Sequence, residues 1–432
     1  PHTADEEVYV MGNPPYLGSS LQSDGQKADM EHVFSPNKGW KNLDYIACWF
    51  YKAAQYIKGE NACYAFVSTN SICQGEQVEL LWKLILKDGL ETKFAYTSFK
   101  WKNNAKSNAG VTCAIIGVAN KKMIQSKTIY SENTAKTVPN INAYLLEGEN
   151  IYISKRYAPM SCLPSMDYGC KAVDDGNLIL SAQEKEDFCE KYPQYEGLIK
   201  ILKGSKEFIN DIDRFCFWIN DNQLDFALTN PEIAKRIEQA RAFRLKSPDV
   251  GARELAKRPH QFREYFKRDC DAIIVPRVSS ERREYIPIGY VGADTVISDS
   301  AFAVYDAELW LFAVLTSKMH NIWVRAVGGR LKTDYRYSAT LCYNTFPFPK
   351  ISAEQKDELK ALAREVLGAR AEHTEMTLGE MYNPETMPVD LRLAHQALDA
   401  SIGRCYRPEP FTSDEERLEY LFKLYERMTK KK

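Results

Sequence analysis

Residues 8–16 read VYVMGNPPY, and this stretch decides the fold. The apolar residues 8–11 end at Gly12, and Pro14 and Pro15 follow. Because two successive prolines cannot extend a central strand, we predict a buried strand that ends abruptly in a loop. Downstream, the sequence predicts a helix over residues 44–57, a strand over 64–68, a helix from about residue 74, a strand over 91–99, and a last, fully apolar strand over 111–118. Strands and helices that alternate in this way are typical of an α/β sheet covered on both faces.

The regular alternation stops near residue 135, where mixed segments and turns begin. We therefore predict a first domain over residues 1–135, a second, α+β domain over 136–350, and a helical region over 351–432. Within that region Ser352-x-x-Gln355 is a capping box at the start of a helix. Two further amphipathic helices are expected over residues 390–406 and 413–428.

The composition sets limits on the class of protein. The chain has 432 residues, enough for two or three domains, and its net charge of −1 gives no overall attraction to a polyanion. Eleven cysteines without a C-x-x-C pair or zinc spacing predict free thiols in a reducing cytoplasm and no metal site. A run of about 18 apolar residues and a signal peptide are both missing, so no membrane span is expected. Because the chain starts at Pro1 and its sharpest motif lies within 16 residues, we interpret it as a fragment of a longer protein.

Asn13-Pro14-Pro15-Tyr16 at a strand end is suited to the methylation of an exocyclic amine. Such an amine is a poor nucleophile because its lone pair is delocalised into the base. The Asn13 side-chain oxygen and the Pro14 carbonyl would accept its two hydrogens and free the lone pair, and two prolines would hold that carbonyl rigidly. Tyr16 would offer a flat face to a base flipped out of a duplex. The alternative is a proline-rich turn without chemistry.

These four residues resemble motif IV of S-adenosylmethionine-dependent amino-group methyltransferases. Residues 66–71 (FVSTNS) resemble the strand end and loop that follow in that fold, and residues 99–101 (FKW) with 111–117 resemble a later motif. In that later motif an aromatic residue covers the second face of the flipped base, a role that the resemblance assigns to Phe99, with Trp101 as runner-up. The alternatives are a helix N-cap cluster for residues 68–71 and a core position for Phe99.

Further segments narrow the resemblance to the MmeI-like, type IIG/IIL single-chain restriction–modification enzymes. These segments are residues 274–282 (IVPRVSSER), 286–289 (IPIG), 329–338 (GRLKTDYRYS), 343–349 (YNTFPFP), 387–388 (MP) and 394–399 (AHQALD). The resemblance implies the C-terminal half of a class I methyltransferase sheet over residues 1–135, a target-recognition domain over 136–350 and a helical tail. It also implies methylation of adenine N6 in double-stranded DNA, within a polypeptide that carries a nuclease, a helical connector, the methyltransferase and the recognition domain in that order.

The glycine-rich cofactor loop of that family lies upstream of motif IV, and this sequence lacks it. No G-x-G turn follows a strand anywhere in the chain, and no acidic pair with Glu-x-Lys marks a nuclease. We therefore expect S-adenosyl-L-methionine as the cofactor of the parent protein, with the main binding loop absent from this chain.

Residues 233–269 hold eleven Lys and Arg against five acids, a net charge of 11 − 5 = +6 in a chain of net −1. This asymmetry favours a surface that faces DNA phosphates. A solvated helix face is the equally weighted alternative.

A second basic cluster lies near residue 330 and is interleaved with two tyrosines. It consists of Arg325, Arg330, Lys332 and Arg336 with one acid, Asp334. On a single strand the last four of these residues would point to one side, where Lys or Arg suits guanine and Asp suits the cytosine amine. We hypothesise that Lys332 and Asp334 read bases and that Arg330 or Arg336 contacts DNA. An exposed strand with cross-strand ion pairs is the alternative.

Arg277, Arg282 and Arg283, around Ser279-Ser280, form a third candidate patch that would hold phosphates. His320 and His395 lie in apolar helical patterns, and we interpret them as core residues rather than catalytic groups.

Other functions remain compatible with the same residues. Asn-Pro-Pro-Tyr also serves methyltransferases that modify a glutamine side chain in proteins, although the long basic second domain argues against them. A DNA-binding specificity module that is inactive without the missing N-terminal half is a further alternative. Cytosine N4 also remains possible, because the same two acceptors suit either amine.

Overall fold

The computed structural model describes residues 6–101, 111–264, 270–331 and 333–430. The chain forms two compact units, each built from separate stretches. The first unit comprises residues 1–161, 322–348 and 411–432, and the second comprises residues 162–321 and 349–410. The three consecutive domains predicted from the sequence stay a prediction, since each unit draws on more than one of them.

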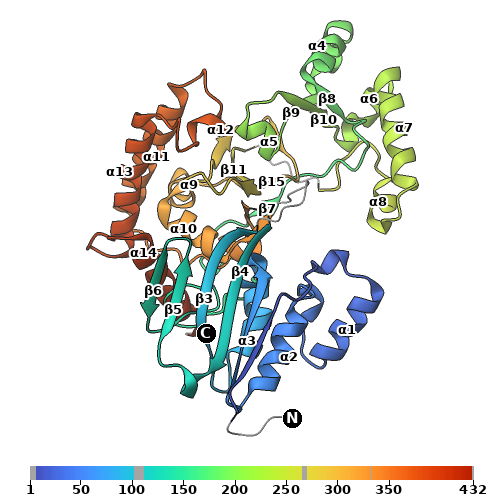
Figure 1. The fold of residues 1–432 in the computed structure, drawn as a ribbon. Coiled ribbons are helices and arrows are strands. Elements are labelled where there is room, and N and C mark those ends of the chain that lie inside the picture. Colours follow the sequence, from blue (N-terminus) through green and yellow to red (C-terminus); the bar gives the residue numbers. More distant parts are fainter. Residues whose placement is uncertain (1–5, 102–110, 265–269, 332, 431–432) are drawn as a thin grey trace. The chain divides into compact units, whose positions relative to one another are not determined.

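A six-stranded sheet is the centre of the first unit, with the strand order β1-β2-β4-β3-β5-β6 (Figure 1). Its strands are β1 (Val8–Gly12), β2 (Ala62–Thr69), β3 (Leu90–Trp101), β4 (Val111–Asn120), β5 (Lys127–Ser131) and β6 (Thr134–Val138). β1 is parallel to β2, and β4 is antiparallel to both β2 and β3. The three strands β1, β2 and β3 therefore run in one direction, and their carboxyl ends meet at one edge of the sheet, where ligands bind in α/β folds.

Helices cover one face of this sheet. They are α1 (Asp24–Phe34), α2 (Ala47–Ile57) and the short α3 (Lys83–Ile85). Phe50 of α2 makes edge-to-face contacts with Tyr64, Phe66 and Trp82, at centroid distances of 5.9, 5.3 and 5.6 Å. Along β2 the buried positions alternate with partly exposed ones, as expected for a strand with one covered face.

The predicted α/β sheet is thus confirmed, with two corrections. The strand over residues 111–118 is not the last one, because β5 and β6 extend the sheet beyond β3. The described helices also cover one face of the sheet rather than both: in Figure 1 no helix crosses in front of β3 and β4, and every second residue of β2 is partly exposed.

The last stretches of the first unit pack around a buried tryptophan. They contain the end of α10 (Lys318–Val327), the hairpin β16 (Gly329–Leu331) and β17 (Asp334–Arg336), and α14 (Asp414–Lys430). Trp323 contacts Phe422 and Tyr425 of α14 at centroid distances of 5.6 and 5.9 Å, and Tyr144 stacks on Phe422 at 5.4 Å. The C-terminal helix is therefore part of the hydrophobic core of this unit.

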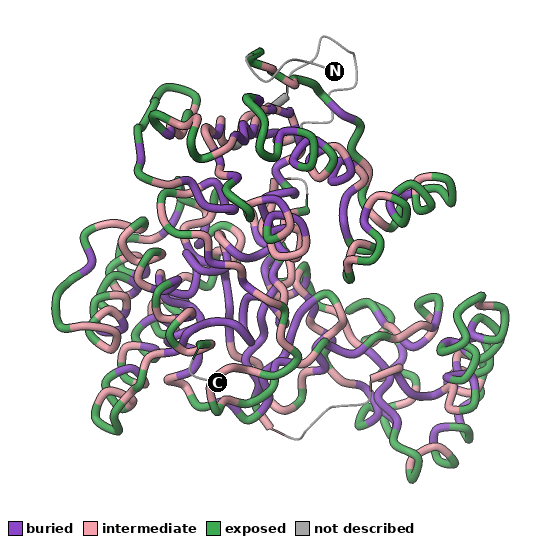
Figure 2. The backbone as a smooth tube through the Cα atoms, turned by 90° about the horizontal axis from the view of Figure 1, so that it is seen from below, coloured by how far each residue is buried: buried purple, intermediate pink, exposed green. Residues whose placement is uncertain are grey.

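The second unit contains two four-stranded sheets, β14-β9-β10-β8 and β13-β11-β15-β7. Their eight strands are β7 (Asp167–Tyr168), β8 (Ile179–Ser181), β9 (Ile199–Lys203), β10 (Arg214–Phe217), β11 (Ala272–Pro276), β13 (Gly289–Val291), β14 (Thr295–Ile297) and β15 (Ala301–Tyr305). The two-residue strand β12 (Val278–Ser279) belongs to neither of these two sheets. The helices are α4 (Ala182–Lys191), α5 (Ser205–Ile209), α6 (Leu224–Leu228), α7 (Pro231–Leu245), α8 (Val250–Leu255), α9 (Leu309–Thr316), α11 (Ala353–Ala371), α12 (Leu378–Met381) and α13 (Val389–Tyr406). Figure 2 shows long buried stretches along the central strands and an alternation of buried and exposed residues along the helices.

Several local predictions are confirmed in this unit. The capping box at Ser352 and Gln355 is present at the start of α11. His320 and His395 are fully buried core residues, and the His395 ring nitrogen Nε2 lies 2.7 Å from the Tyr382 hydroxyl. All eleven cysteines of the chain are free thiols, and Cys162 is the exposed one.

Candidate functional site

The catalytic candidates gather at the edge where β1, β2 and β3 end. Asn13 directly follows Gly12, the last residue of β1, which lies beside Phe66 of β2. β2 continues for three residues to Thr69, which pairs with Cys113 of β4, and Cys113 pairs with Phe99 of β3. The Asn-Pro-Pro-Tyr loop, the turn after Thr69 and Phe99 therefore share one edge of the sheet.

The loop after β1 presents its functional groups to solvent. Asn13, Pro15 and Tyr16 are exposed, whereas Pro14 is buried. Pro14 restricts the backbone in two ways: its ring is held by burial, and the ring fixes its own φ angle. Asn13 and Tyr16 are thus accessible to a substrate while the backbone between them is anchored.

Asp44 anchors the far end of this loop, and reasoning from the sequence missed it. Its carboxylate oxygen Oδ1 accepts hydrogen bonds from the Leu17 and Ile46 backbone N–H groups, at 2.9 and 3.1 Å. The Leu17 carbonyl in turn accepts from the Tyr45 backbone N–H at 3.0 Å and from the Gln22 side chain at 3.1 Å. Burial raises the pKa of Asp44, and the two backbone hydrogen bonds act in the opposite direction. An acidic residue at the start of the helix predicted over residues 44–57 is the only signal that pointed to this position.

The turn after β2 is a short 3₁₀ segment, Asn70–Cys73. Its N-cap residue Thr69 makes no side-chain capping hydrogen bond, and the Thr69 and Ser71 hydroxyls lie 2.6 Å apart instead. Capping at this helix start therefore does not account for the run of Ser, Thr and Asn at this edge.

Phe99 is half-buried and lies edge-on to Tyr96 at a centroid distance of 5.4 Å. A bulge in β3 between these two residues shifts the register against β4, and bulges of this kind re-aim side chains next to active sites. The side chain of Trp101, the runner-up for the stacking role, lies outside the described residues.

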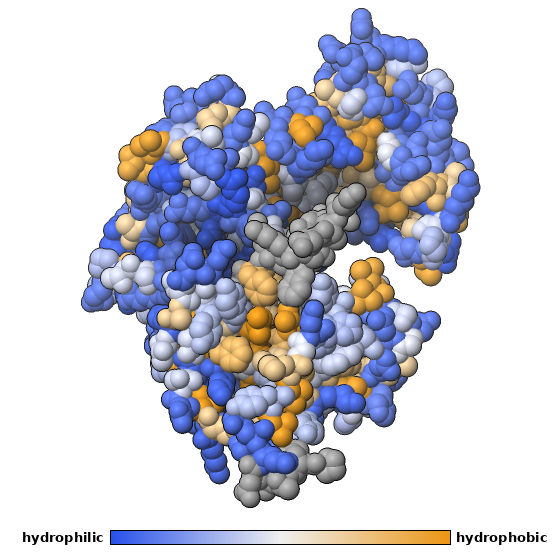
Figure 3. Space-filling view, viewed as in Figure 1, coloured by the Kyte–Doolittle hydropathy of each residue, from blue (hydrophilic) through white to orange (hydrophobic). Residues whose placement is uncertain are grey.

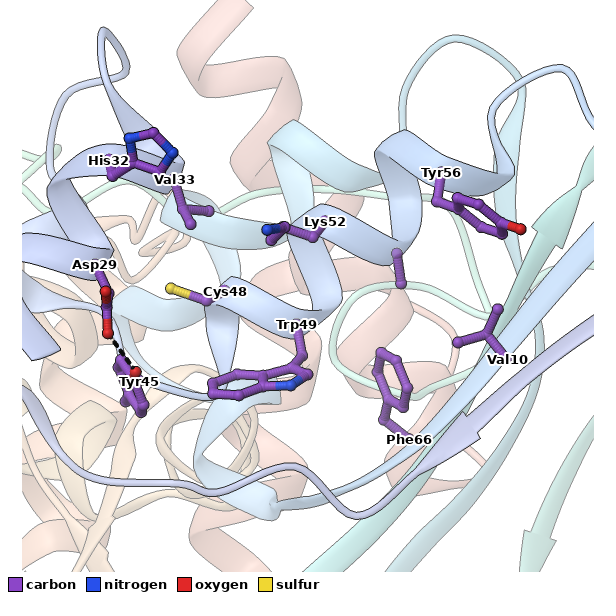
Figure 4. A pocket seen from close by; sticks show the side chains of 11 residues that line it. Val10, Asp29, His32, Val33, Tyr45, Cys48, Trp49, Lys52, Tyr56 and Phe66 are labelled. Atoms are coloured by element: carbon purple, nitrogen blue, oxygen red, sulfur yellow. Dashed lines mark hydrogen bonds between the residues drawn. The ribbon is translucent and has the colours of Figure 1, made fainter. Parts of the chain in front are cut away.

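A pocket of about 640 Å³ lies beside β1, between α1 and α2 (Figure 4). Val10, Trp49 and Phe66 form an apolar wall, and at the other end Asp29 accepts a hydrogen bond of 2.7 Å from the Tyr45 hydroxyl. That hydrogen bond raises the pKa of Tyr45 to about 12.

This pocket does not fit S-adenosylmethionine as a cofactor cradle. Val10 lies within β1 and not at its carboxyl end, and Asp29 is already bound to Tyr45. The sequence also lacks the glycine-rich turn whose backbone would approach the cofactor. The described residues thus present the Asn-Pro-Pro-Tyr loop at the sheet edge but no complete cofactor site.

The cluster around residue 330 is a hairpin and not a single strand, which corrects the predicted geometry. Arg330 of β16 pairs with Tyr335 of β17, and Leu331 pairs with Asp334. Because directly paired residues share a face, Arg330 lies on the face opposite to that of Asp334 and Arg336. Lys332 lies outside the described residues.

Tyr335 holds two arginines of this cluster. The Arg330 guanidinium lies 4.2 Å from the Tyr335 ring centroid and the Arg325 guanidinium lies 5.5 Å from it. Arg330 also donates a hydrogen bond of 2.7 Å to the Thr333 carbonyl. Arg336, by contrast, is exposed. The stacked ring orients the two guanidinium groups, and planar groups of this kind suit guanine and phosphate.

The basic stretch 233–269 is only partly a surface. Lys235, Arg241, Lys246 and Lys257 are exposed, but Arg244 is fully buried in the second unit. The Arg244 guanidinium donates to five backbone carbonyls, those of Ala172, Val173, Leu255, Arg258 and Gln261. Its role is therefore structural. The prediction that included Arg244 among the cations that would face phosphates was wrong. Lys267 and Arg268 lie outside the described residues.

The arginines of the third candidate patch have separate surroundings. The Arg277 guanidinium lies 5.0 Å from the Tyr168 ring and 5.7 Å from the Phe302 ring, and it donates to the Asp299 carbonyl at 2.6 Å. Arg282 is exposed and forms an ion pair with Glu385. Among the residues with described positions, no cluster of three or more His, Cys, Asp and Glu suits a metal ion.

The chain matches three domain families over most of its length. Residues 1–131 match "MmeI, DNA-methyltransferase domain", residues 147–350 match "MmeI, target recognition domain", and residues 351–431 match "MmeI, C-terminal domain". The chain therefore belongs to the MmeI family of restriction–modification DNA methyltransferases, which confirms the resemblance.

Two relatives are similar over nearly the whole chain. DNA methyltransferase A of Bacillus subtilis (strain 168) is 47% identical over 431 residues, which cover 100% of this chain and 49% of that protein. The type IIL restriction-modification enzyme MmeI, solved in complex with DNA, superposes with a TM-score of 0.91 at 40% identity, covering 98% of this chain and 57% of that chain. The chain thus spans about half the length of these relatives. Within the described ranges, no helix is both long and apolar enough to cross a membrane.

Proposed function

We propose that this chain is the part of a site-specific DNA adenine-N6 methyltransferase that carries the amine-binding loop and the sequence-reading surface. The observation that carries the proposal is the Asn13-Pro14-Pro15-Tyr16 loop, exposed at the carboxyl end of β1 in a member of a DNA-methyltransferase family. The choice of adenine over cytosine rests on the family resemblance, because the two acceptors suit either amine.

In the proposed reaction the loop acts on a base that has left the duplex. The Asn13 side-chain oxygen and the Pro14 carbonyl accept hydrogen bonds from the two amine N–H groups, which makes the nitrogen lone pair available for attack on the methyl group. The nitrogen loses one of its two protons to water as the N–C bond forms. S-adenosylmethionine, when bound by the complete protein, supplies that methyl group. Tyr16 and Phe99 stack on the flipped base, whose unstacking costs a few kcal/mol. Asp44 keeps the loop in place, so little reorganisation accompanies the reaction.

Double-stranded DNA is the proposed partner, read by residues of the second and third basic clusters. Asp334 and Lys332 would contact base edges, and Arg325, Arg330 and Arg336 would hold DNA close to them. Arg277 and Arg282 are proposed to contact phosphates, and Arg282 would have to exchange its partner Glu385 for DNA.

The test uses a complete relative of the length of the Bacillus subtilis protein, labelled S-adenosylmethionine and duplex DNA of mixed sequence. The asparagine that corresponds to Asn13 is replaced by alanine, and the control is an alanine at the position of Asn133, an exposed residue in the turn between β5 and β6. We expect label on adenine N6 in the parent and the control, and a loss of at least 100-fold in the first variant. Label on cytosine would contradict the choice of base, and no label on DNA would contradict the function.

A DNA-binding specificity module without its own catalysis is the second candidate function, favoured by the incomplete cofactor site. The isolated 432-residue chain distinguishes the two. A module would bind DNA with an affinity that falls as salt is raised, and it would transfer no methyl group even with excess cofactor.

A further inference from the structure

A short connector follows the turn after β2. It consists of Gly75, Glu76 and Gln77 and leads into the helical segment Val78–Trp82. Its glycine contacts the start of the β16–β17 hairpin, and its two polar side chains bind the segment that carries Asp44. The connector therefore touches both the proposed reading hairpin and the anchor of the Asn-Pro-Pro-Tyr loop.

The contact with the hairpin is formed by two glycines. Gly75 is buried, and its φ angle of +57° is a left-handed conformation that favours glycine. A Cβ atom at Gly75 would lie 3.7 Å from the Cα and 3.8 Å from the backbone nitrogen of Gly329, the first residue of β16. Because neither residue has a side chain that could adjust, a shift of the hairpin start moves the connector backbone.

The start of the hairpin is itself closely packed. The Gly328 N–H donates a hydrogen bond of 2.9 Å to the Val324 carbonyl, and a Cβ atom at Gly328 would lie 2.5 Å from that oxygen. Asn70 of the turn after β2 lines a cavity of about 1120 Å³ together with Arg325 and Arg330 of the second basic cluster. Two arginines that are proposed to hold DNA thus adjoin the turn that precedes the connector.

On its other side, the connector orients the segment that anchors the loop. The Gln77 side-chain oxygen Oε1 accepts a hydrogen bond of 3.0 Å from the Asp44 backbone N–H, and the Nε2 atom donates one of 2.7 Å to the Asn42 carbonyl. Glu76 accepts a further hydrogen bond of 3.1 Å from the Asn42 side chain. Since the Asp44 carboxylate accepts the hydrogen bond from Leu17, the position of Gln77 affects the end of the Asn-Pro-Pro-Tyr loop.

The connector and this segment lie on the helix-covered face of the six-stranded sheet. A Cβ atom at Gly39, shortly before the segment, would lie 2.6 Å from a methyl carbon of Leu80, so the chain packs along the helical segment Val78–Trp82. Trp82 in turn contacts Phe50 of α2 at a centroid distance of 5.6 Å. The opposite face, where Figure 3 shows an apolar area over the strands, therefore takes no part in these contacts.

We propose that the connector couples sequence reading to methyl transfer. This inference rests on the proposed function: a hairpin that meets a wrong base pair takes a different position on the DNA, and Gly329, Gly75 and Asp44 shift in turn. Packed groups and hydrogen bonds of this kind carry coupling between two sites. Gln77 is then a positioning residue, because it acts on the loop through Asp44. A misplacement of about 1 Å lowers a reaction rate by about 100-fold, so the correct DNA sequence is distinguished in the rate of methyl transfer as well as in binding.

The first experiment tests the link in the 432-residue chain, without DNA or cofactor. Amide hydrogen exchange is measured at Leu17 and Tyr45, because their N–H groups donate to the Asp44 carboxylate and to the Leu17 carbonyl. Gln77→Met keeps the length of the side chain and removes its hydrogen bonds. Gln125→Met, at an exposed residue between β4 and β5, is the matched control.

We expect both amides to exchange at least about 10-fold faster in Gln77→Met and at the parent rate in the control. Amides of α11, which lies in the second unit, are the internal reference for global unfolding. Unchanged exchange of Leu17 and Tyr45 in Gln77→Met would overturn the proposal.

The second experiment measures single-turnover methyl transfer by the complete Bacillus subtilis relative at saturating DNA. Two DNAs are compared, the preferred site and the same site with one base pair changed. The variants carry leucine or alanine at the position of Gly75. Both place a Cβ atom at the same positive φ angle, but the alanine methyl group fits at 3.7 Å from Gly329, whereas leucine displaces Gly329. Alanine is therefore the matched control for backbone strain.

In the leucine variant we expect the ratio of the two rate constants to fall at least about 10-fold, because the loop is then displaced on both DNAs. The affinity for the preferred DNA and the ratio in the alanine variant should stay close to those of the parent. A leucine variant that keeps its rates, or that loses them by the same factor on both DNAs, would show a purely local role of the connector and overturn the proposal. An absence of methyl transfer by the parent would instead contradict the proposed function, so the two failures are distinguishable.

Discussion

The Asp44 carboxylate accepts a hydrogen bond of 2.9 Å from the Leu17 backbone N–H, which ties the end of the Asn-Pro-Pro-Tyr loop to the start of α2. The two residues are 27 positions apart in the chain. Because the loop leaves the sheet immediately after β1, this hydrogen bond fixes the far end of the loop, and the one from the Ile46 backbone N–H orients the Asp44 carboxylate. The position of the candidate motif therefore depends on a residue outside it.

Replacing Asp44 by alanine is expected to lower the free energy of unfolding of the chain by about 2 kcal/mol, since one buried and one part-buried backbone donor lose their acceptor. Asp44→Asn keeps an acceptor oxygen at the same place and is expected to cost less than half as much. Urea denaturation measures both values. Equal losses in the two variants would mean that the charge of Asp44, rather than its hydrogen bonds, holds the loop.

In a complete relative, the variant that corresponds to Asp334→Asn is expected to methylate a different DNA sequence. The rate of methylation at its preferred site is expected to fall by no more than a few-fold. The reason is that a good pairing with a base edge discriminates by about 1–3 kcal/mol. Sequencing of methylated sites in randomised DNA measures the preference, with Asp357→Asn, on the exposed surface of α11, as the control. An unaltered sequence preference in the Asp334 variant would show that Asp334 does not read a base.

Arg244→Met is expected to destabilise the second unit by about 3 kcal/mol or more, because five carbonyls lose a buried donor at once. Burial lowers the pKa of Arg244 to about 10, so its guanidinium still carries its charge at neutral pH. Arg241→Met on the exposed side of α7 is the control and should change the stability little. If the two variants unfolded at the same urea concentration, the Arg244 hydrogen bonds would not contribute to the free energy of unfolding.

The ion pair between His373 and Asp390 predicts a pH dependence of stability. The His373 ring nitrogen Nε2 lies 2.9 Å from an Asp390 oxygen, and this hydrogen bond raises the pKa of His373 above 6.5. The stabilisation is therefore complete below pH 6.5 and is lost as the pH rises through the raised value in the folded protein. The difference in melting temperature between the parent chain and His373→Gln should shrink between pH 6 and pH 8.5. A constant difference over this range would contradict the assignment.

Much of the catalytic edge could be predicted because its chemistry is local in sequence. Asn13 to Tyr16 are contiguous, and two prolines end a strand wherever they occur. The directions of β1, β2 and β3 were implied by the α/β pattern, which brings the loop, the turn at Asn70 and Phe99 to one edge. The two strands after β4 were missed because they are short and only partly apolar, at residues 127–131 and 134–138.

The residues of the basic cluster around residue 330 could be identified in the sequence, but their geometry could not be predicted. Residues 332 and 333 connect β16 to β17, and Lys-Thr lacks the Asn-Gly or Asp-Gly signal of a two-residue hairpin. A single strand was therefore the simpler expectation. It placed Arg330 on the same face as Asp334 and Arg336, whereas in the hairpin Arg330 lies on the opposite face. Likewise, the sequence shows Arg244 only as one of eleven cations in a basic stretch. Its burial among five backbone carbonyls could not be predicted.

By itself, the sequence determined the class of fold, the position of the Asn-Pro-Pro-Tyr motif at a strand end and the membership in the MmeI family, because these depend on residues that are close together along the chain. Only the tertiary structure decided that Asp44 anchors the loop, that Arg244 is buried and that one face of the sheet is open. Each of these depends on contacts between residues far apart in sequence, such as Arg244 and the Val173 carbonyl, 71 positions apart. The free energy of such contacts depends on burial and geometry, which residue type and spacing along the chain do not specify.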